Sequence, residues 1–146
     1  MAGAVYLADT SIYVLQGRSA RVKMRFQTLL MEGRLATCQM TALEFLNNAP
    51  DPKGYEILRK AIHGQRWIEV DEAAMNRAME VHRMLAADSQ HRAFALPDLI
   101  IAAAAEVAGA TVLHYDADYD RIAAVTGQPT EWVVPRGSIR PAVTPP

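Results

Sequence analysis

The sequence of 146 residues contains a single cysteine, Cys38, and no long hydrophobic run. One cysteine excludes a disulfide within the chain and a zinc site built from several thiolates, and it fits a reducing compartment. The most apolar stretch, Leu99 to Ala105, is too short to span a bilayer, and the first ten residues lack the basic segment of a signal peptide. We therefore expect a soluble, cytoplasmic protein with no membrane partner.

An excess of positive charge is also lacking, since the formal net charge is -1. A protein that coats nucleic acid through bulk positive charge is therefore excluded, and any activity on RNA or DNA requires a local site. Hydrophobic residues make up 51% of the chain and charged residues 21%, which is typical of one globular domain of this length. We expect one domain over residues 1–135, followed by a flexible, proline-rich tail over residues 136–146.

Short apolar runs alternate with stretches of helical periodicity along the chain. The apolar runs predict strands at residues 4–8, 35–38, 67–70, 111–114 and 132–134. Periodicity and capping signals predict helices over residues 18–32, 41–48, 51–62, 71–85, 98–108 and 119–125. This order predicts an α/β fold, a three-layer α/β/α sandwich with a mainly parallel central sheet.

Four acidic residues fall where predicted strands end or predicted helices begin. Asp9 and Asp116 follow strands, Glu44 lies in the first turns of a helix, and Asp98 opens the alanine-rich helix. Because ligands of parallel sheets bind beyond the carboxyl ends of the strands, all four acids can share one edge. Clustered carboxylates repel one another unless divalent cations neutralise them, and oxygen-only ligands suit Mg²⁺ or Mn²⁺. Together the acids predict a metal site.

Each acid taken singly also has a purely structural interpretation. Asp9 can cap the helix after it, and Glu44 can close a capping box with Thr41. Asp98 can stabilise the first turn of its helix through the helix dipole. Asp118 or Asp120 can cap the helix that follows the acidic loop. These alternatives stay open at the level of sequence.

Other phosphate- or cation-binding patterns do not fit. An EF-hand is excluded because Arg121 stands where its loop needs glycine. A response-regulator receiver needs an acidic pair after the first strand, but here Asp9 is followed by Thr10 and Ser11. A haloacid-dehalogenase-type phosphatase needs a second Asp at position 11, which is Ser11.

Four blocks of the sequence resemble PIN-domain nucleases, and most of all the VapC toxins of bacterial toxin–antitoxin pairs. They are LADTS from Leu7, the Glu44 helix, LPDLIIAA from Leu96 and TVLHYDADYDRIA from Thr111. The resemblance covers residues 5–134, in the order and with the spacing of the family. It implies a PIN-like α/β/α sandwich whose acidic pocket binds Mg²⁺ or Mn²⁺ and cleaves RNA endonucleolytically.

The resemblance also implies roles for individual residues and partners. The implied catalytic acids are Asp9, Glu44, Asp98 and Asp116. The implied metal ligands are Asp9, Asp98, Asp116 and Asp118, with Asp9 and Asp98 the foremost direct ligands and Asp118 an accessory. Thr10 or Ser11 would orient the first acid or a bound water. The implied partners are an RNA substrate, a cognate antitoxin and a second copy of the chain.

Several functional alternatives remain at this stage. A PIN-like nuclease can act on DNA, or on RNA in processing outside a toxin–antitoxin pair, and a non-catalytic interaction module would use its acids only as helix caps. The basic residues Arg18, Arg21, Lys23 and Arg25 either contact nucleic-acid phosphates or form a solvated helix face.

Overall fold

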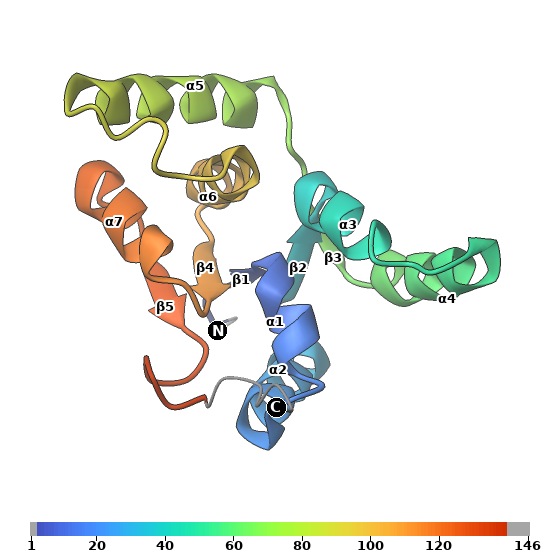
Figure 1. Ribbon diagram of the computed structural model, residues 1–146. Coiled ribbons are helices and arrows are strands. Elements are labelled where there is room, and N and C mark those ends of the chain that lie inside the picture. The colour runs from blue at the N-terminus through green and yellow to red at the C-terminus, as the bar shows by residue number, and fades with distance from the viewer. Residues whose placement is uncertain (1–2, 140–146) are drawn as a thin grey trace, which may run out of the picture.

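Five short strands lie side by side in one parallel sheet at the centre of the computed structural model, which describes residues 3–139 (Figure 1). They are β1 (Tyr6–Ala8), β2 (Leu35–Cys38), β3 (Arg66–Ile68), β4 (Thr111–His114) and β5 (Thr130–Trp132). Their order across the sheet is β3-β2-β1-β4-β5, and every neighbouring pair is parallel. The chain leaves β1 toward one edge and later returns to β4 on its other side, so the strand order reverses between β1 and β4.

Seven helices connect and cover the strands in the described part of the chain. They are α1 (Thr10–Leu15), α2 (Ala20–Met31), α3 (Gln39–Leu46), α4 (Pro52–His63), α5 (Glu72–Ala87), α6 (Leu96–Ala108) and α7 (Ala117–Thr126). Polar side chains cap several of them as the sequence predicts. Asp51 caps α4 just before Pro52, and Asp71 caps α5 by accepting a hydrogen bond from the backbone N–H of Ala74. Gly109 ends α6 with a φ of 71°, a left-handed conformation that favours glycine.

Two hydrophobic cores lie on the two faces of the sheet. Leu7 of β1 belongs to the core formed with α5, α6 and α7, whereas its neighbour Ala8 belongs to the core formed with α1 and α2. This alternation follows from the two-residue period of a strand, whose successive side chains point to opposite faces. Figure 1 shows the two groups of helices on either side of the strands. The predicted three-layer α/β/α sandwich with a parallel sheet is therefore confirmed.

Several predicted boundaries were wrong. The helix α1 was missed because six residues are too few to display a helical period, although Ile12 and Tyr13 are both buried. The last strand occupies Thr130–Trp132 rather than residues 132–134. Val133 and Val134 are buried beyond its end, and the backbone N–H of Val133 still donates a hydrogen bond of 2.8 Å to the His114 carbonyl of β4.

Three further boundaries, one of a strand and two of helices, differ from the prediction. Strand β3 covers Arg66–Ile68 instead of residues 67–70. Helix α6 starts at Leu96, two residues before Asp98, and α7 starts at Ala117, two residues before Tyr119. The first buried residue is Leu99 in α6 and Tyr119 in α7, so the buried apolar period begins two or three residues after each helix starts.

No helix among the described residues is both long enough and apolar enough to cross a membrane. Most of the tail predicted at residues 136–146, namely residues 140–146, lies outside the described residues. Before that point, the backbone N–H groups of Gly137 and Ile139 donate hydrogen bonds to the Tyr115 hydroxyl, at 3.0 and 3.1 Å.

Candidate metal centre

The acidic residues gather at the edge of the sheet where the strand order reverses. Asp9 directly follows β1, and Asp116 lies two residues after β4. Asp98 comes to the same place from the first turn of α6, because α6 packs over β1 and β4. This position beyond the carboxyl ends of the strands is where parallel sheets bind their ligands.

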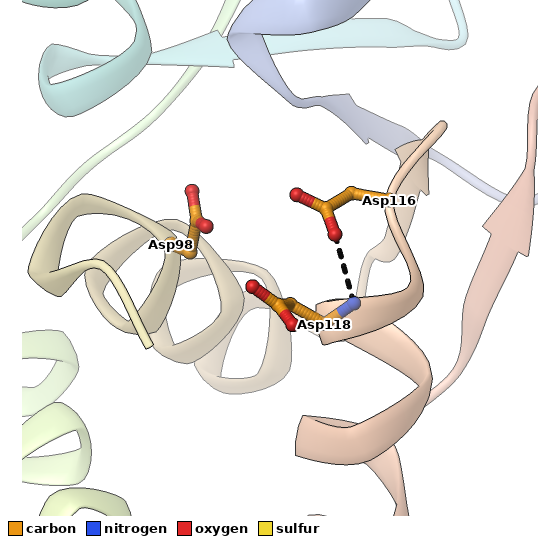
Figure 2. Close-up of side chains that lie close together, drawn as sticks. All are labelled: Asp98, Asp116 and Asp118. Atoms are coloured by element: carbon orange, nitrogen blue, oxygen red, sulfur yellow. Dashed lines mark hydrogen bonds between the residues drawn. The ribbon is translucent and has the colours of Figure 1, made fainter. Parts of the chain in front are cut away.

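Three carboxylates lie close enough together to hold one ion. Oxygen atoms of Asp98, Asp116 and Asp118 all lie within 4.8 Å of one another. Figure 2 shows their side chains converging from α6, the end of β4 and the start of α7. Asp116 Oδ1 also accepts a hydrogen bond of 2.9 Å from the backbone N–H of Asp118, which ties the loop that carries both.

Asp9 forms the buried floor beside this group. Its side chain is only 6% exposed, and both of its oxygens accept hydrogen bonds. Ser11 Oγ donates to Oδ2 at 2.7 Å, and the Tyr119 hydroxyl donates to Oδ1 at 2.7 Å. The same hydroxyl lies 3.3 Å from Asp98 Oδ1. Tyr119 thus connects Asp9 to Asp98, a contact that sequence reasoning missed.

Glu44 is held by a hydroxyl group from another helix. Thr10, the first residue of α1, donates a hydrogen bond of 2.7 Å to Glu44 Oε1 in α3. The capping-box interpretation of Glu44 is wrong, because α3 begins at Gln39 and Thr41 lies inside it. The buried Thr41 hydroxyl donates to the Ala8 carbonyl at 3.3 Å instead.

The other helix-capping interpretations have mixed outcomes. Asp9 does cap α1, and Asp116, rather than Asp118 or Asp120, caps α7. Capping and a place in the acidic group are compatible because each carboxylate has several acceptor positions. Asp120 accepts a hydrogen bond of 3.0 Å from Trp132 Nε1 and belongs to the outer side of α7.

The carboxylates of the group lie close together with little positive charge from the protein to balance them. Burial and the neighbouring carboxylates of Asp9 and Asp116 raise the pKa of Asp98 to about 7, and Glu44 adds to this shift. Within residues 3–139, the one basic side chain that forms an ion pair with these acids is Arg121, 3.3 Å from Asp118. A purely carboxylate donor set with so little internal compensation suits a hard divalent cation such as Mg²⁺. The residues present therefore fit such an ion.

Residues outside the group mostly have structural roles. Cys38 is buried, as expected of a small hydrophobic side chain. Of the four basic residues on and before α2, Arg25 is engaged by Glu131 at 3.0 Å and by the carbonyl groups of Trp132 and Val133. Arg18, Arg21 and Lys23 are exposed.

Comparison with known proteins agrees with this geometry. A family model described as the PIN domain matches residues 6–125. The chain is 41% identical over 137 residues to Ribonuclease VapC18 of Mycobacterium tuberculosis, covering 92% of this chain and 99% of that protein.

Solved structures share the fold at low sequence identity. DNA-bound VapBC from Salmonella typhimurium matches with a TM-score of 0.73 and 17% identity, over 90% of this chain and 100% of that one. A toxin–antitoxin complex from Klebsiella pneumoniae matches with a TM-score of 0.62 and 18% identity, over 77% and 87% of the two chains. The family model and the curated relative decide the family: this chain belongs to the PIN-domain family and, within it, to the VapC group.

Proposed function

We propose that this protein is a metal-dependent endoribonuclease that hydrolyses RNA phosphodiesters and serves as the toxin of a toxin–antitoxin pair. One observation carries the proposal: oxygens of Asp98, Asp116 and Asp118 lie within 4.8 Å of one another at the reversal point of the sheet. The ribonuclease activity named for its relative from Mycobacterium tuberculosis supports the choice of RNA as substrate.

We assign the residues to roles by their position and hydrogen bonding. Asp98, Asp116 and Asp118 would hold Mg²⁺ or Mn²⁺, with Asp9 completing the set from the buried side. When bound, such an ion activates water and neutralises charge on the phosphate. Glu44 is free to accept a proton through the oxygen that Thr10 does not occupy.

The reaction that follows from these roles is a hydrolysis. The water oxygen forms a bond to phosphorus, the bond from phosphorus to the 3′ oxygen breaks, and one proton of the water passes to a carboxylate. The departing 3′ oxygen takes up a proton, from that carboxylate or from solvent. The products are a 5′-phosphate and a 3′-hydroxyl. Asp98, Asp116 and Asp118 are the residues that would hold the ion, which would supply charge stabilisation during this hydrolysis.

The proposed partners follow from the same family membership. The fold matches a toxin–antitoxin complex from Klebsiella pneumoniae, and we expect a cognate antitoxin to cover the acidic edge and a second copy of the chain to form a homodimer. Size-exclusion chromatography with light scattering measures the association of two copies, and co-expression with the product of any short reading frame found beside the gene tests the antitoxin.

The test is cleavage of labelled RNA by the purified protein with Mg²⁺, with Mn²⁺ and with EDTA. We expect cleavage with either ion, none with EDTA, and loss of cleavage in Asp98→Asn and Asp9→Asn. Asp120→Asn is the matched control, because Asp120 lies in the same first turn of α7 as Asp118 but binds Trp132. Equal cleavage by wild type, Asp98→Asn and Asp9→Asn would contradict the assignment.

A parallel assay on single-stranded DNA separates the substrate classes. The metal chemistry is the same for both, so a preference for RNA has to come from contacts to the 2′-hydroxyl. Cleavage of DNA at the rate of RNA would replace the proposed substrate, and absence of both activities together with unchanged stability in Mg²⁺ would favour a non-catalytic interaction module.

A further inference from the structure

Tyr119 is a buried tyrosine whose hydroxyl faces two carboxylates at once. The side chain is 0% exposed, and its hydroxyl lies 2.7 Å from Asp9 Oδ1 and 3.3 Å from Asp98 Oδ1. A phenol carries one hydrogen, so the shorter contact, to Asp9, is the main hydrogen bond of Tyr119. The contact between the same hydroxyl and Asp98 is weaker. Since the three residues come from the start of α7, the end of β1 and the start of α6, one hydroxyl joins three elements.

The aromatic ring holds this hydroxyl at a fixed place. Tyr119 is the third residue of α7, and Asp116 caps that helix. The ring packs against the buried His114 ring with centroids 5.0 Å apart, and it belongs to the same core as Leu7 of β1. Close packing around a fully buried ring restricts its movement. The hydroxyl is therefore held at one place relative to the two carboxylates.

The two carboxylates need such an anchor because they repel each other. Asp9 is among the groups that raise the pKa of Asp98, together with burial of the Asp98 side chain. Ser11 Oγ holds the outer oxygen of Asp9 at 2.7 Å, and Tyr119 holds its inner oxygen. The orientation of Asp9 is thus fixed at both oxygens, while an oxygen of Asp98 lies within 4.8 Å of oxygens of Asp116 and Asp118.

We propose that Tyr119 is a positioning residue whose hydroxyl couples Asp9 to Asp98 and sets their spacing for a divalent cation. The proposal rests on the metal-dependent function proposed above. In this role Tyr119 acts through Asp9 and Asp98, the two carboxylates that its hydroxyl contacts. Hydrogen-bonding partners of ligating carboxylates commonly change metal affinity or activity by about 10- to 100-fold when removed.

The test compares two tyrosine-to-phenylalanine variants that each delete one buried hydroxyl. Tyr119→Phe removes the contact to the carboxylates, whereas Tyr13→Phe removes a hydrogen bond of 2.8 Å to Gln65, between α1 and the segment before β3. Mn²⁺ affinity of the RNA-free protein is titrated by electron paramagnetic resonance, and circular dichroism melting monitors the fold. RNA cleavage is then measured against Mg²⁺ concentration.

We expect Tyr119→Phe to melt cooperatively, to bind Mn²⁺ about tenfold or more weakly, and to need correspondingly more Mg²⁺ for half-maximal cleavage, with KM for RNA changed less than about twofold. Tyr13→Phe should keep the wild-type Mn²⁺ affinity even if it melts earlier. Wild-type affinity in Tyr119→Phe, or an equal loss in both variants, would overturn the positioning role alone. No Mn²⁺ binding by the wild-type protein would overturn this proposal and the proposed metal dependence together.

Discussion

Thr10 donates a hydrogen bond from its hydroxyl to Glu44 Oε1 at 2.7 Å, while the next residue, Ser11, donates to Asp9 Oδ2 at 2.7 Å. Two consecutive hydroxyl groups at the start of α1 therefore orient two different acids. The sequence left open which of them orients an acid, and the structure gives each its own carboxylate. The short helix α1 exists at the right place for this because Asp9 caps it.

Replacing Thr10 by valine tests the importance of the first contact. Thr10→Val keeps the shape of the side chain and removes the donor, so Glu44 loses a hydrogen bond of a kind that contributes about 1.5–3 kcal/mol. We expect the cleavage rate to fall about tenfold or more, with wild-type affinity for RNA. Thr10→Ser retains the hydroxyl and should restore most of the rate. Full activity in Thr10→Val would show that Glu44 needs no such orientation.

The raised pKa of Asp98 predicts how the stability of the metal-free protein depends on pH. Burial and the charges of Asp9 and Asp116 raise this pKa from 3.8 to about 7. Between these values the folded protein binds a proton that the unfolded chain has released. The contribution of Asp98 to the free energy of unfolding is therefore fully present below about pH 4 and is lost as the pH rises to about 7.

Asp98→Asn isolates this contribution. Burial lowers the pKa of His114, so the contribution of His114 to the free energy of unfolding rises with pH, opposite to that of Asp98. The wild type and the variant both contain His114, so its contribution cancels in the comparison. With EDTA present, we expect the melting temperature of Asp98→Asn relative to that of the wild type to be highest at pH 8 and to fall steadily as the pH is lowered to 5. Asp120→Asn should show no such pH-dependent gain. A constant difference between wild type and Asp98→Asn across this range would contradict the shift.

Addition of Mg²⁺ should stabilise the folded protein. An ion that binds only the folded state raises the free energy of unfolding by about 2.7 kcal/mol when its concentration is 100 times the dissociation constant. We expect the melting temperature to rise with Mg²⁺ and with Mn²⁺, and the rise to be much smaller in Asp118→Asn, because Asp118 belongs to the group of three converging carboxylates. Asp120→Asn again serves as the control. A rise of equal size in Asp118→Asn would remove Asp118 from the ligand set.

The convergence of the acids was predictable because it follows from topology. Asp9 and Asp116 each follow an apolar strand, and parallel pairing places the ends of β1 and β4 next to each other. The alanine-rich helix over residues 98–108 was also predicted, and residues 101–105 of α6 are buried. These features are local patterns or direct consequences of the strand order.

The supporting hydrogen bonds were not predictable in the same way. Thr10 and Glu44 are separated by 34 positions, and Tyr119 and Asp9 by 110. Which hydroxyl meets which carboxylate depends on how α1, α3 and α7 are rotated on the sheet, and no period in the sequence records that rotation. A tyrosine between two acidic residues, Asp118 and Asp120, at the start of α7 was the one available signal, and it equally suits an ordinary core residue.

The basic residues of α2 now divide into a structural group and a candidate RNA-contacting group. Arg25 is anchored by Glu131 and two backbone carbonyls, whereas Arg21 is exposed and lines a surface hollow of about 680 Å³ together with Trp132. Trp132 pairs in register with His114, two residues before Asp116. This hollow therefore reaches the end of β5, which lies beside the end of β4 that precedes Asp116.

Neutralising Arg21 should weaken RNA binding by removing an interaction with a phosphate. For single-stranded nucleic acid, the slope of log affinity against log salt becomes shallower by about 0.7 for each phosphate that the protein no longer neutralises. We expect Arg21→Gln to bind a non-cleavable RNA more weakly at low salt, with a slope reduced by about this amount and unchanged melting. Arg83→Gln, an exposed residue of α5 in the other helical layer, carries the same charge change and should behave as wild type. Identical salt slopes for both variants and the wild type would leave Arg21 as a solvated residue of the helix surface.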